Sequence, residues 1–270
     1  MRGRVLIIAG SDSGGGAGIQ ADIKTVTMLG AFAMTALTAL TAQNTLGVFG
    51  VLPIAPEFIR QQIDVVLDDI GADAVKTGML HDAAVIETVA EILAERAADV
   101  PLVVDPVMVA KGGAPLIEPG AIEALKRLLI PRAAILTPNL PEAEILAGHA
   151  IPDLAAMRRA ADELLALGCR AVLLKGGHLA GDTLHDVLAT ASGERLWGSP
   201  RIATRHTHGT GCTLASAIAA GIAQGLAIDA AVERARDYVH RAILSAPGLG
   251  HGHGPLDHAH PLHQDGCDAP

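Results

Sequence analysis

Short apolar runs of strand length alternate with amphipathic segments of helical length along almost the whole chain. Residues 5–9 and 102–104 are continuous apolar runs, which is typical of parallel strands covered on both faces. Residues 56–70 carry apolar side chains at helical spacing. This alternation predicts an α/β fold with a doubly wound, mostly parallel sheet and helices on both of its faces.

The same patterns place the individual elements. We expect strands at 5–9, 32–41, 45–54, 72–76, 102–105, 133–136 and 171–174, a hairpin over 182–190 and 195–197, and helices at 19–30, 56–70, 81–98, 119–129, 153–167, 209–225 and 229–245.

A glycine-rich segment, Thr207-His208-Gly209-Thr210-Gly211-Cys212-Thr213, precedes a run of small and apolar residues that predicts a helix. Gly209 and Gly211 have no Cβ atoms to keep backbone N–H groups away from a ligand. Together with the free N–H groups of the first helical turn, they can form an anion-binding concavity. Cys212 stands at its mouth and could accept a proton. The alternative is a loop that only turns a strand into a helix.

Composition excludes several classes of function. The 270 residues carry a formal net charge of −9 and five aromatic side chains, so the chain offers neither a basic footprint nor a stacking platform for nucleic acid. Residues 25–56 are uncharged, but scattered threonines and glycines favour buried strands over a membrane span. Three distant cysteines suit a reducing cytoplasm, and the N-terminal apolar run is too short for a signal peptide.

Polar residues follow the predicted strands where these end. In open α/β sheets the carboxyl ends of the strands form the ligand-binding edge. The residues in question are Asp12 and Gln20 near the glycine-rich loop 10–18, Gln43, Asp105, Asn139 with Glu142, and Lys175. Residues 106–117, which include Lys111-Gly112-Gly113, are long enough to form a lid.

Two of these positions have alternative interpretations. Gln43 could bond nearby backbone, or its carboxamide could recognise a heterocycle. Asn139 could cap a helix with Glu142 in the first turn, or the two could bind metal or phosphate. An anion nest, a cation and two carboxylates at one sheet edge together suit phosphoryl transfer, although the chain has no Walker A motif.

Motifs throughout the chain resemble those of the hydroxymethylpyrimidine/phosphomethylpyrimidine kinases of thiamine biosynthesis. The similar segments are 10–12, 14–22, 42–44 (Ala-Gln-Asn), 76–80 (Lys-Thr-Gly-Met-Leu), 105–108, 137–144, 174–178, 207–213 and 252–255. The resemblance implies a three-layer α/β/α ribokinase-like fold, usually homodimeric, that uses MgATP to phosphorylate a hydroxymethyl group and then the resulting monophosphate.

The resemblance also implies a role for each matching residue. Gln43, Gly10, Asp12, Met79 and Val107 would bind the aminopyrimidine. Asn139, Lys175, Thr207 and Thr210 would bind ATP, and Asp105 and Glu142 would organise Mg²⁺. Gly209 and Gly211 would form the anion hole, with Cys212 as the base. We expect the helix N-terminus to lower the pKa of that thiol and ATP to raise it, which leaves a base competent near neutrality.

Other functions remain possible at this stage. A pyridoxine or pyridoxal kinase of the same superfamily would share Cys212, and a vitamin-binding protein would keep Gln43 and Met79 without the anion hole. We expect a single kinase domain over residues 1–247 and a Gly/His/Pro-rich tail over 248–270. The five tail histidines and Cys267 could suggest metal storage or sensing, but their spacing favours incidental affinity.

Overall fold

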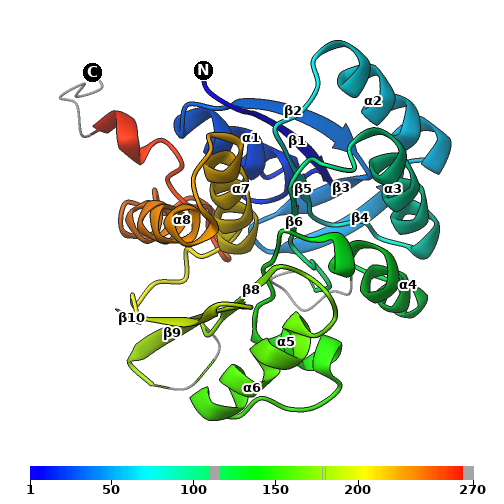
Figure 1. Cartoon of the computed structure of the whole chain (residues 1–270). Coiled ribbons are helices and arrows are strands. Elements are labelled where there is room, and N and C mark those ends of the chain that lie inside the picture. Colours follow the sequence, from blue (N-terminus) through cyan, green and yellow to red (C-terminus); the bar gives the residue numbers. More distant parts are fainter. Residues whose placement is uncertain (110–115, 178, 180, 264–270) are drawn as a thin grey trace.

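The computed structural model describes residues 1–109, 116–177, 179 and 181–263. They form a three-layer α/β/α structure in which helices cover both faces of a central sheet, as expected (Figure 1). The strands are β1 (Arg4–Ala9), β2 (Phe32–Leu37), β3 (Ala39–Asn44), β4 (Gly47–Pro53), β5 (Ala74–Thr77), β6 (Leu102–Val104), β7 (Ile135–Leu136), β8 (Ala171–Lys175), β9 (Thr183–Thr190) and β10 (Gly193–Pro200).

Among the described residues, seven α-helices lie close to the predicted ranges, and an eighth, Leu140–Ala147, has no predicted range. They are α1 (Gly18–Met28), α2 (Pro56–Asp69), α3 (Ala83–Arg96), α4 (Pro119–Ala124), α5 (Leu140–Ala147), α6 (Leu154–Leu165), α7 (Thr210–Ala223) and α8 (Ile228–Leu244). A π-helical turn, η1 (Leu125–Leu129), and a 3₁₀ turn, η2 (Ile130–Arg132), continue α4, and a 3₁₀ turn, η3 (His260–His263), ends the described chain.

The main sheet has eight strands in the order β10-β9-β8-β7-β6-β5-β1-β2. The pairs from β8 to β2 are all parallel, and the predicted β9–β10 hairpin adds two antiparallel strands at one edge. The carboxyl ends of the parallel strands therefore lie along one edge, where a mostly parallel sheet binds its ligands.

Alternation along each strand divides the core in two. Leu6 and Ile8 of β1 lie in the cluster formed with α2 to α6, whereas Val5 and Ile7 lie in the cluster formed with α1, α7 and α8. Figure 1 shows these two groups of helices on opposite faces of the sheet. All four side chains are fully buried, which explains why β1 is a continuous apolar run in the sequence.

The single strand predicted over residues 32–41 is wrong, because the chain forms two strands there. β2 pairs with β1, but β3 leaves the main sheet and pairs antiparallel with β4 in a separate two-stranded sheet. Thr38 marks the break, and its buried hydroxyl donates to the carbonyl of Met79. Beyond it, the backbone bonds to the glycine loop instead, where Ser11 N–H donates to the carbonyl of Ala39. This turn in the chain places Gln43 over the carboxyl end of β1.

The described part of the tail packs against the rest of the protein. Tyr238 of α8 donates to the carbonyl of His258, and Thr213 Oγ1 lies 3.0 Å from Nε2 of the same histidine. His253 N–H donates to the carbonyl of Thr45 in the β3–β4 turn. The domain boundary at residue 247 stays a prediction. Residues 110–115 of the predicted lid (106–117), His178 and Cys267 lie outside the described residues.

No helix among the described residues has the length and apolar character needed to cross a membrane.

Candidate active site

Charged side chains from two strand ends meet the start of α7. Lys175 is the last residue of β8, and Asp105 directly follows β6. Lys175 Nζ donates to Asp105 Oδ1 at 3.4 Å. A Cβ atom on Gly211 would lie 3.4 Å from Lys175 Nζ and 3.7 Å from Asp105 Oδ2. The fold therefore brings Gly211, Lys175 and Asp105 together, as the sequence predicted.

Glu142 and Asn139 form the first turn of α5 and face the same cluster. Asn139 Oδ1 accepts from Glu142 N–H, and Glu142 Oε2 accepts from Asn139 N–H, which makes a reciprocal capping box. The capping interpretation is thus confirmed. Burial raises the pKa of Glu142 to about 7, the charge of Asp105 adds to this rise, and Lys175 opposes it. Two carboxylates that repel each other across one lysine are a donor set that a cation would relieve.

Gly209 is the N-cap of α7 and fixes where the helix begins. Its φ of +82° lies in the left-handed region, and a Cβ atom there would lie 1.8 Å from the carbonyl oxygen of Gly16. Only glycine lets the two glycine segments, which are far apart in the sequence, touch in this way. Thr210, the first residue of the helix, donates from Oγ1 to the carbonyl of Thr207 at 3.1 Å.

Cys212 is partly buried in the first turn of α7, and the backbone N–H of Gly18 bonds its thiol. Burial nevertheless raises the pKa of Cys212 to about 12, above its ordinary value of 9.0. Desolvation therefore outweighs the Gly18 contact at this thiol, and the role of Cys212 as the base stays a prediction.

The opposite end of the edge holds the residues predicted to bind the pyrimidine. A Cβ atom on Gly10 would lie 3.1 Å from Met79 Sδ, so these two residues are adjacent. Met79 is buried, and Val107 is partly buried two residues beyond Asp105. Gln43 is partly buried in β3. Their roles toward a substrate stay predictions, although the fold places them along one edge.

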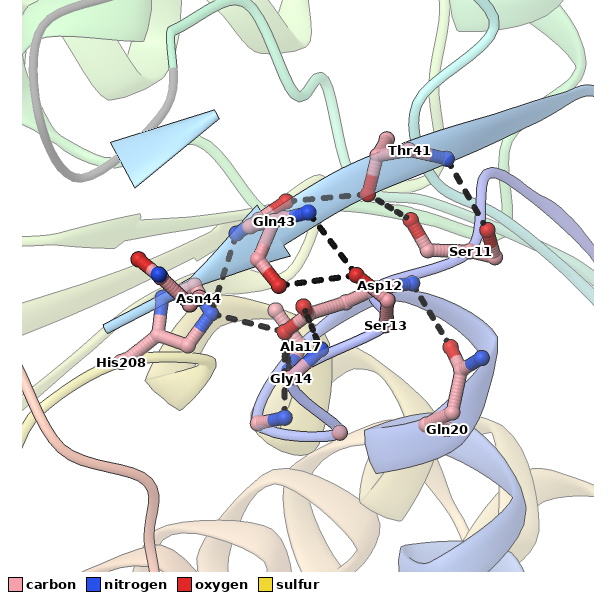
Figure 2. A network of polar contacts seen from close by, with 12 residues as sticks. Ser11, Asp12, Ser13, Gly14, Ala17, Gln20, Thr41, Gln43, Asn44 and His208 are labelled. Carbon is pink, nitrogen blue, oxygen red and sulfur yellow. Dashed lines mark hydrogen bonds and ion pairs between the residues drawn. The ribbon is translucent and has the colours of Figure 1, made fainter. Parts of the chain in front are cut away.

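Asp12 organises the glycine loop, and His208 is a site residue that the sequence did not single out. Asp12 is buried and accepts from the N–H groups of Gly14, Gly16 and Ala17 at 2.8, 3.0 and 2.8 Å. His208 Nε2 lies 2.8 Å from Asp12 Oδ2 (Figure 2). Burial works to raise the pKa of Asp12, but His208 and these backbone donors outweigh it and lower the pKa.

His208 Nε2 also lies 3.1 Å from Gln43 Nε2, so the imidazole packs between the glycine loop and β3 (Figure 2). Because Asp12 is a carboxylate, the proton on Nε2 points toward it, and Nε2 cannot also accept from the Gln43 amide. The Gln43 N–H donors thus stay available to a ligand. In the sequence, the position of His208 next to Gly209 does not reveal this role.

Three hydroxyl groups hold β3 against the same loop. Ser13 Oγ donates to the carbonyl of Gln43 at 2.8 Å, and Gln43 N–H donates back to Ser13 Oγ at 2.8 Å. Thr41 Oγ1 donates to the carbonyl of Ser11 at 2.9 Å, while Thr41 N–H donates to Ser11 Oγ. Gln20 Oε1 accepts from Asp12 N–H at 2.8 Å. These bonds fix the Gln43 backbone before any ligand binds.

A preformed metal cage is absent from the described residues, which contain no group of three His, Cys, Asp or Glu side chains arranged to hold an ion. Mg²⁺ in kinases is held by one or two carboxylates together with substrate phosphates and water. Asp105 and Glu142 fit that arrangement.

A model of the phosphomethylpyrimidine kinase family matches residues 12–257. The chain belongs to this family. It is 52% identical over 254 residues to the hydroxymethylpyrimidine/phosphomethylpyrimidine kinase of Streptomyces coelicolor, and the match covers 94% of this chain and 93% of that one. It is 55% identical over 258 residues to the thiamine biosynthesis bifunctional protein ThiED of Geobacter sulfurreducens, where it covers 95% of this chain and 52% of the larger protein.

Solved structures of two kinds share the fold of this phosphomethylpyrimidine kinase family member. The phosphomethylpyrimidine kinase of Clostridium difficile matches with a TM-score of 0.79 and 43% identity, over 89% of this chain and 99% of that one. An ADP complex of Bacillus subtilis pyridoxal kinase matches with a TM-score of 0.89 and 38% identity, over 96% and 98% of the two chains. Fold similarity therefore confirms a ribokinase-like kinase without choosing its substrate.

Proposed function

We propose that this protein uses ATP to phosphorylate 4-amino-5-hydroxymethyl-2-methylpyrimidine, and then its monophosphate, in thiamine biosynthesis. The observation that carries the proposal is the 52% identity to the Streptomyces coelicolor kinase, which extends over nearly the whole of both chains. The convergence of the predicted residues on one sheet edge supports it.

At the end of the sheet edge formed by Gly10, Gln43 and Met79, the side-chain N–H groups of Gln43 donate to the polar edge of the aminopyrimidine. Gly10 and Met79, which are adjacent, provide a flat and apolar wall for the ring, and Val107 lines its other side. Asp12 serves the same end by holding the glycine loop close to the ring, since Gly14, Gly16 and Ala17 all donate to it.

At the phosphate end, Lys175 and Asn139 lie along the ATP phosphates, with Thr207 and Thr210 at the start of α7. Lys175 and the α7 N-terminus supply the positive potential that such a site needs. The backbone N–H groups at Gly209 and Gly211 bind the transferred phosphoryl group and stabilise the charge that develops on its oxygens.

Cys212 is the base. Its thiolate accepts the proton of the substrate hydroxyl, the hydroxyl oxygen forms a bond to the γ-phosphorus, and the bond between that phosphorus and the ADP oxygen breaks. Asp105 and Glu142 would hold Mg²⁺, which would supply positive charge against the phosphate oxygens. These two residues fit the ion through their facing, mutually repelling carboxylates.

We further propose a cytoplasmic homodimer. Several large apolar side chains lie more than half exposed on the β3–β4 turn, on β4 and on α2. They are Leu46, Phe49, Leu52 and Phe58, exposed by 62, 72, 61 and 55%. Clustered exposure of this kind marks an interaction surface.

The test is steady-state kinetics with MgATP on hydroxymethylpyrimidine, its monophosphate and pyridoxal, measured side by side. We expect both pyrimidines to be phosphorylated with a higher kcat/KM than pyridoxal. A higher kcat/KM for pyridoxal would instead assign the chain to the activity of its Bacillus subtilis structural relative. Turnover of none of the three would refute the proposal.

A further inference from the structure

A fully buried ion pair lies below the start of α7. Lys76 Nζ donates to both carboxylate oxygens of Asp22, at 3.0 and 2.9 Å, and Ser216 Oγ donates to Asp22 Oδ1 at 2.7 Å. Lys76, Asp22 and Ser216 are each 0% exposed. An apolar pair of similar volume is often as stable as a buried ion pair, so stability alone does not account for these charges.

The neighbouring first turns of α1 and α7 place this ion pair close to Cys212. Gly18 and Asp22 are one turn apart on α1, and Cys212 and Ser216 are one turn apart on α7. The backbone N–H of Gly18 lowers the pKa of the Cys212 thiol, and one turn below Ser216 Oγ donates to Asp22. Since residues four apart lie on one face of a helix, the ion pair is one helical turn from the thiol.

The lysine side chain reaches toward the active-site edge. A Cβ atom on Gly78 would lie 2.9 Å from Lys76 Nζ, and Gly78 follows the carboxyl end of β5. The ammonium group therefore lies beside Gly78, at the carboxyl end of β5, where the active-site edge of the sheet begins. Glycine at position 78 leaves the space that it occupies.

Four charged side chains on four different elements act on Cys212. They are Lys76 of β5, Asp22 of α1, Asp105 after β6 and Lys175 at the end of β8. Burial raises the pKa of the Cys212 thiol, Lys76 lowers it by more than either carboxylate raises it, and Asp22 and Asp105 raise it. Of these charges, the ammonium of Lys76 is the strongest stabiliser of a thiolate at this position.

We propose that Lys76 is a positioning residue for phosphoryl transfer, whose buried ammonium, held by Asp22 and Ser216, stabilises the Cys212 thiolate while it accepts the substrate proton. The inference rests on the proposed function for the reaction itself. The electrostatic effect on Cys212 is independent of substrate and can be measured without turnover.

The experiment measures the rate of Cys212 alkylation by iodoacetamide between pH 7 and 9, followed by mass spectrometry of the peptide that contains Cys212. Cys267→Ser removes one competing thiol, and burial raises the pKa of Cys169 to about 11. The two halves of the ion pair should act in opposite directions. Lys76→Met slows alkylation and Asp22→Asn accelerates it, each by about threefold or more for a pKa shift of about one unit, because a more basic thiolate is also more nucleophilic.

Two further variants separate charge from packing. Lys76→Met with Asp22→Asn leaves no unpaired buried charge, so it folds even if Lys76→Met alone does not, and it should alkylate more slowly than wild type because the effect of the lysine exceeds that of the aspartate. Thr77→Val, fully buried beside Lys76, changes no charge and should leave the rate within about twofold of wild type, below the change expected for one pKa unit.

Alkylation of the double variant at or above the wild-type rate, or equal-sign effects of the two single changes, would overturn the inference even if the wild type phosphorylates hydroxymethylpyrimidine. Opposite-sign effects in a protein that turns over neither pyrimidine would instead support the inference and refute the proposed function. With active protein, Lys76→Met should lower kcat and leave the KM for the pyrimidine unchanged.

Discussion

Asp12→Asn distinguishes a residue that organises the glycine loop from one that contacts the substrate through its charge. Asp12 Oδ2 faces three donors, Gly16 N–H, Ala17 N–H and His208 Nε2–H, whereas Oδ1 faces only the exposed Gly14 N–H. Asparagine can place its amide oxygen toward the three donors and its NH₂ group toward Gly14. One hydrogen bond is then lost at a position that water can reach, and the bonds that remain are weaker because the acceptor has lost its charge.

We therefore expect Asp12→Asn to cost about 1–2 kcal/mol, most of it in stability. For a protein of this size that lowers Tm by roughly 2–8 °C. The KM for hydroxymethylpyrimidine should rise by less than about tenfold, which corresponds to 1.4 kcal/mol. Differential scanning fluorimetry and steady-state kinetics on the same preparation measure both effects.

His208→Leu is the matched change on the other side of the bond. It leaves Asp12 charged with its backbone donors and removes the contact to Gln43, so it should lower Tm and raise the pyrimidine KM together. If the Asp12 charge contacts the substrate directly, Asp12→Asn should instead raise the KM for hydroxymethylpyrimidine by about 30-fold or more and leave Tm unchanged. A 30-fold change corresponds to ~2 kcal/mol. That combination would refute the organising role.

Three further predictions concern the substrate, the metal and the base. Gln43→Leu should weaken pyrimidine binding by about 1–3 kcal/mol with little change in the KM for ATP, because it leaves ligand groups unpaired; equal weakening of both would indicate a folding defect. Glu142→Gln should raise the Mg²⁺ concentration needed for half-maximal activity, with partial recovery at high Mg²⁺; an unchanged Mg²⁺ titration would leave Glu142 as a helix cap only. Because burial raises the pKa of Cys212 to about 12, the thiolate fraction of the free enzyme and kcat/KM should rise about tenfold per pH unit from pH 6 to 9. Cys212→Ala should lose ~10²–10⁴-fold in kcat together with this slope, whereas turnover within about threefold of wild type would mean that the anion hole suffices.

The elements of the main sheet could be predicted from the sequence because their burial leaves a local pattern. The strand β1 is apolar from Val5 to Ala9 since both of its faces are covered there, and α2 shows helical spacing since only one of its faces is covered. The division of residues 32–41 left no such pattern. Its cause is non-local, because the backbone beyond Thr38 bonds the loop at Ser11, which lies 27 positions earlier in the chain.

The site residues could be predicted to the extent that they follow strand ends. Asp105 and Lys175 do so, and the fold joins them. His208 lacked a signal of its own, since a histidine beside a glycine motif does not reveal that Asp12 and Gln43 lie against its ring. Lys76 stands in the motif at 76–80, but nothing in the sequence predicts its buried ion pair with Asp22. The pKa of Cys212 could not be read from the sequence, because the sign of its shift depends on how completely the thiol is buried.

The ligand-free site holds its charges in pairs that MgATP is suited to exchange. Lys175 is bonded to Asp105 at 3.4 Å, so neither group has an unpaired charge in this state. A phosphate can pair with Lys175 only if another cation replaces the lysine beside Asp105. A cation can bind the carboxylates only if Lys175 moves away from Asp105. MgATP brings both charges at once, so the exchange costs less than binding either alone. Burial raises the pKa of Glu142 to about 7, so a cation placed beside its carboxylate would stabilise the charged form. We therefore propose that the arrangement favours the nucleotide as its magnesium complex, while the His208 network holds β3 against the glycine loop.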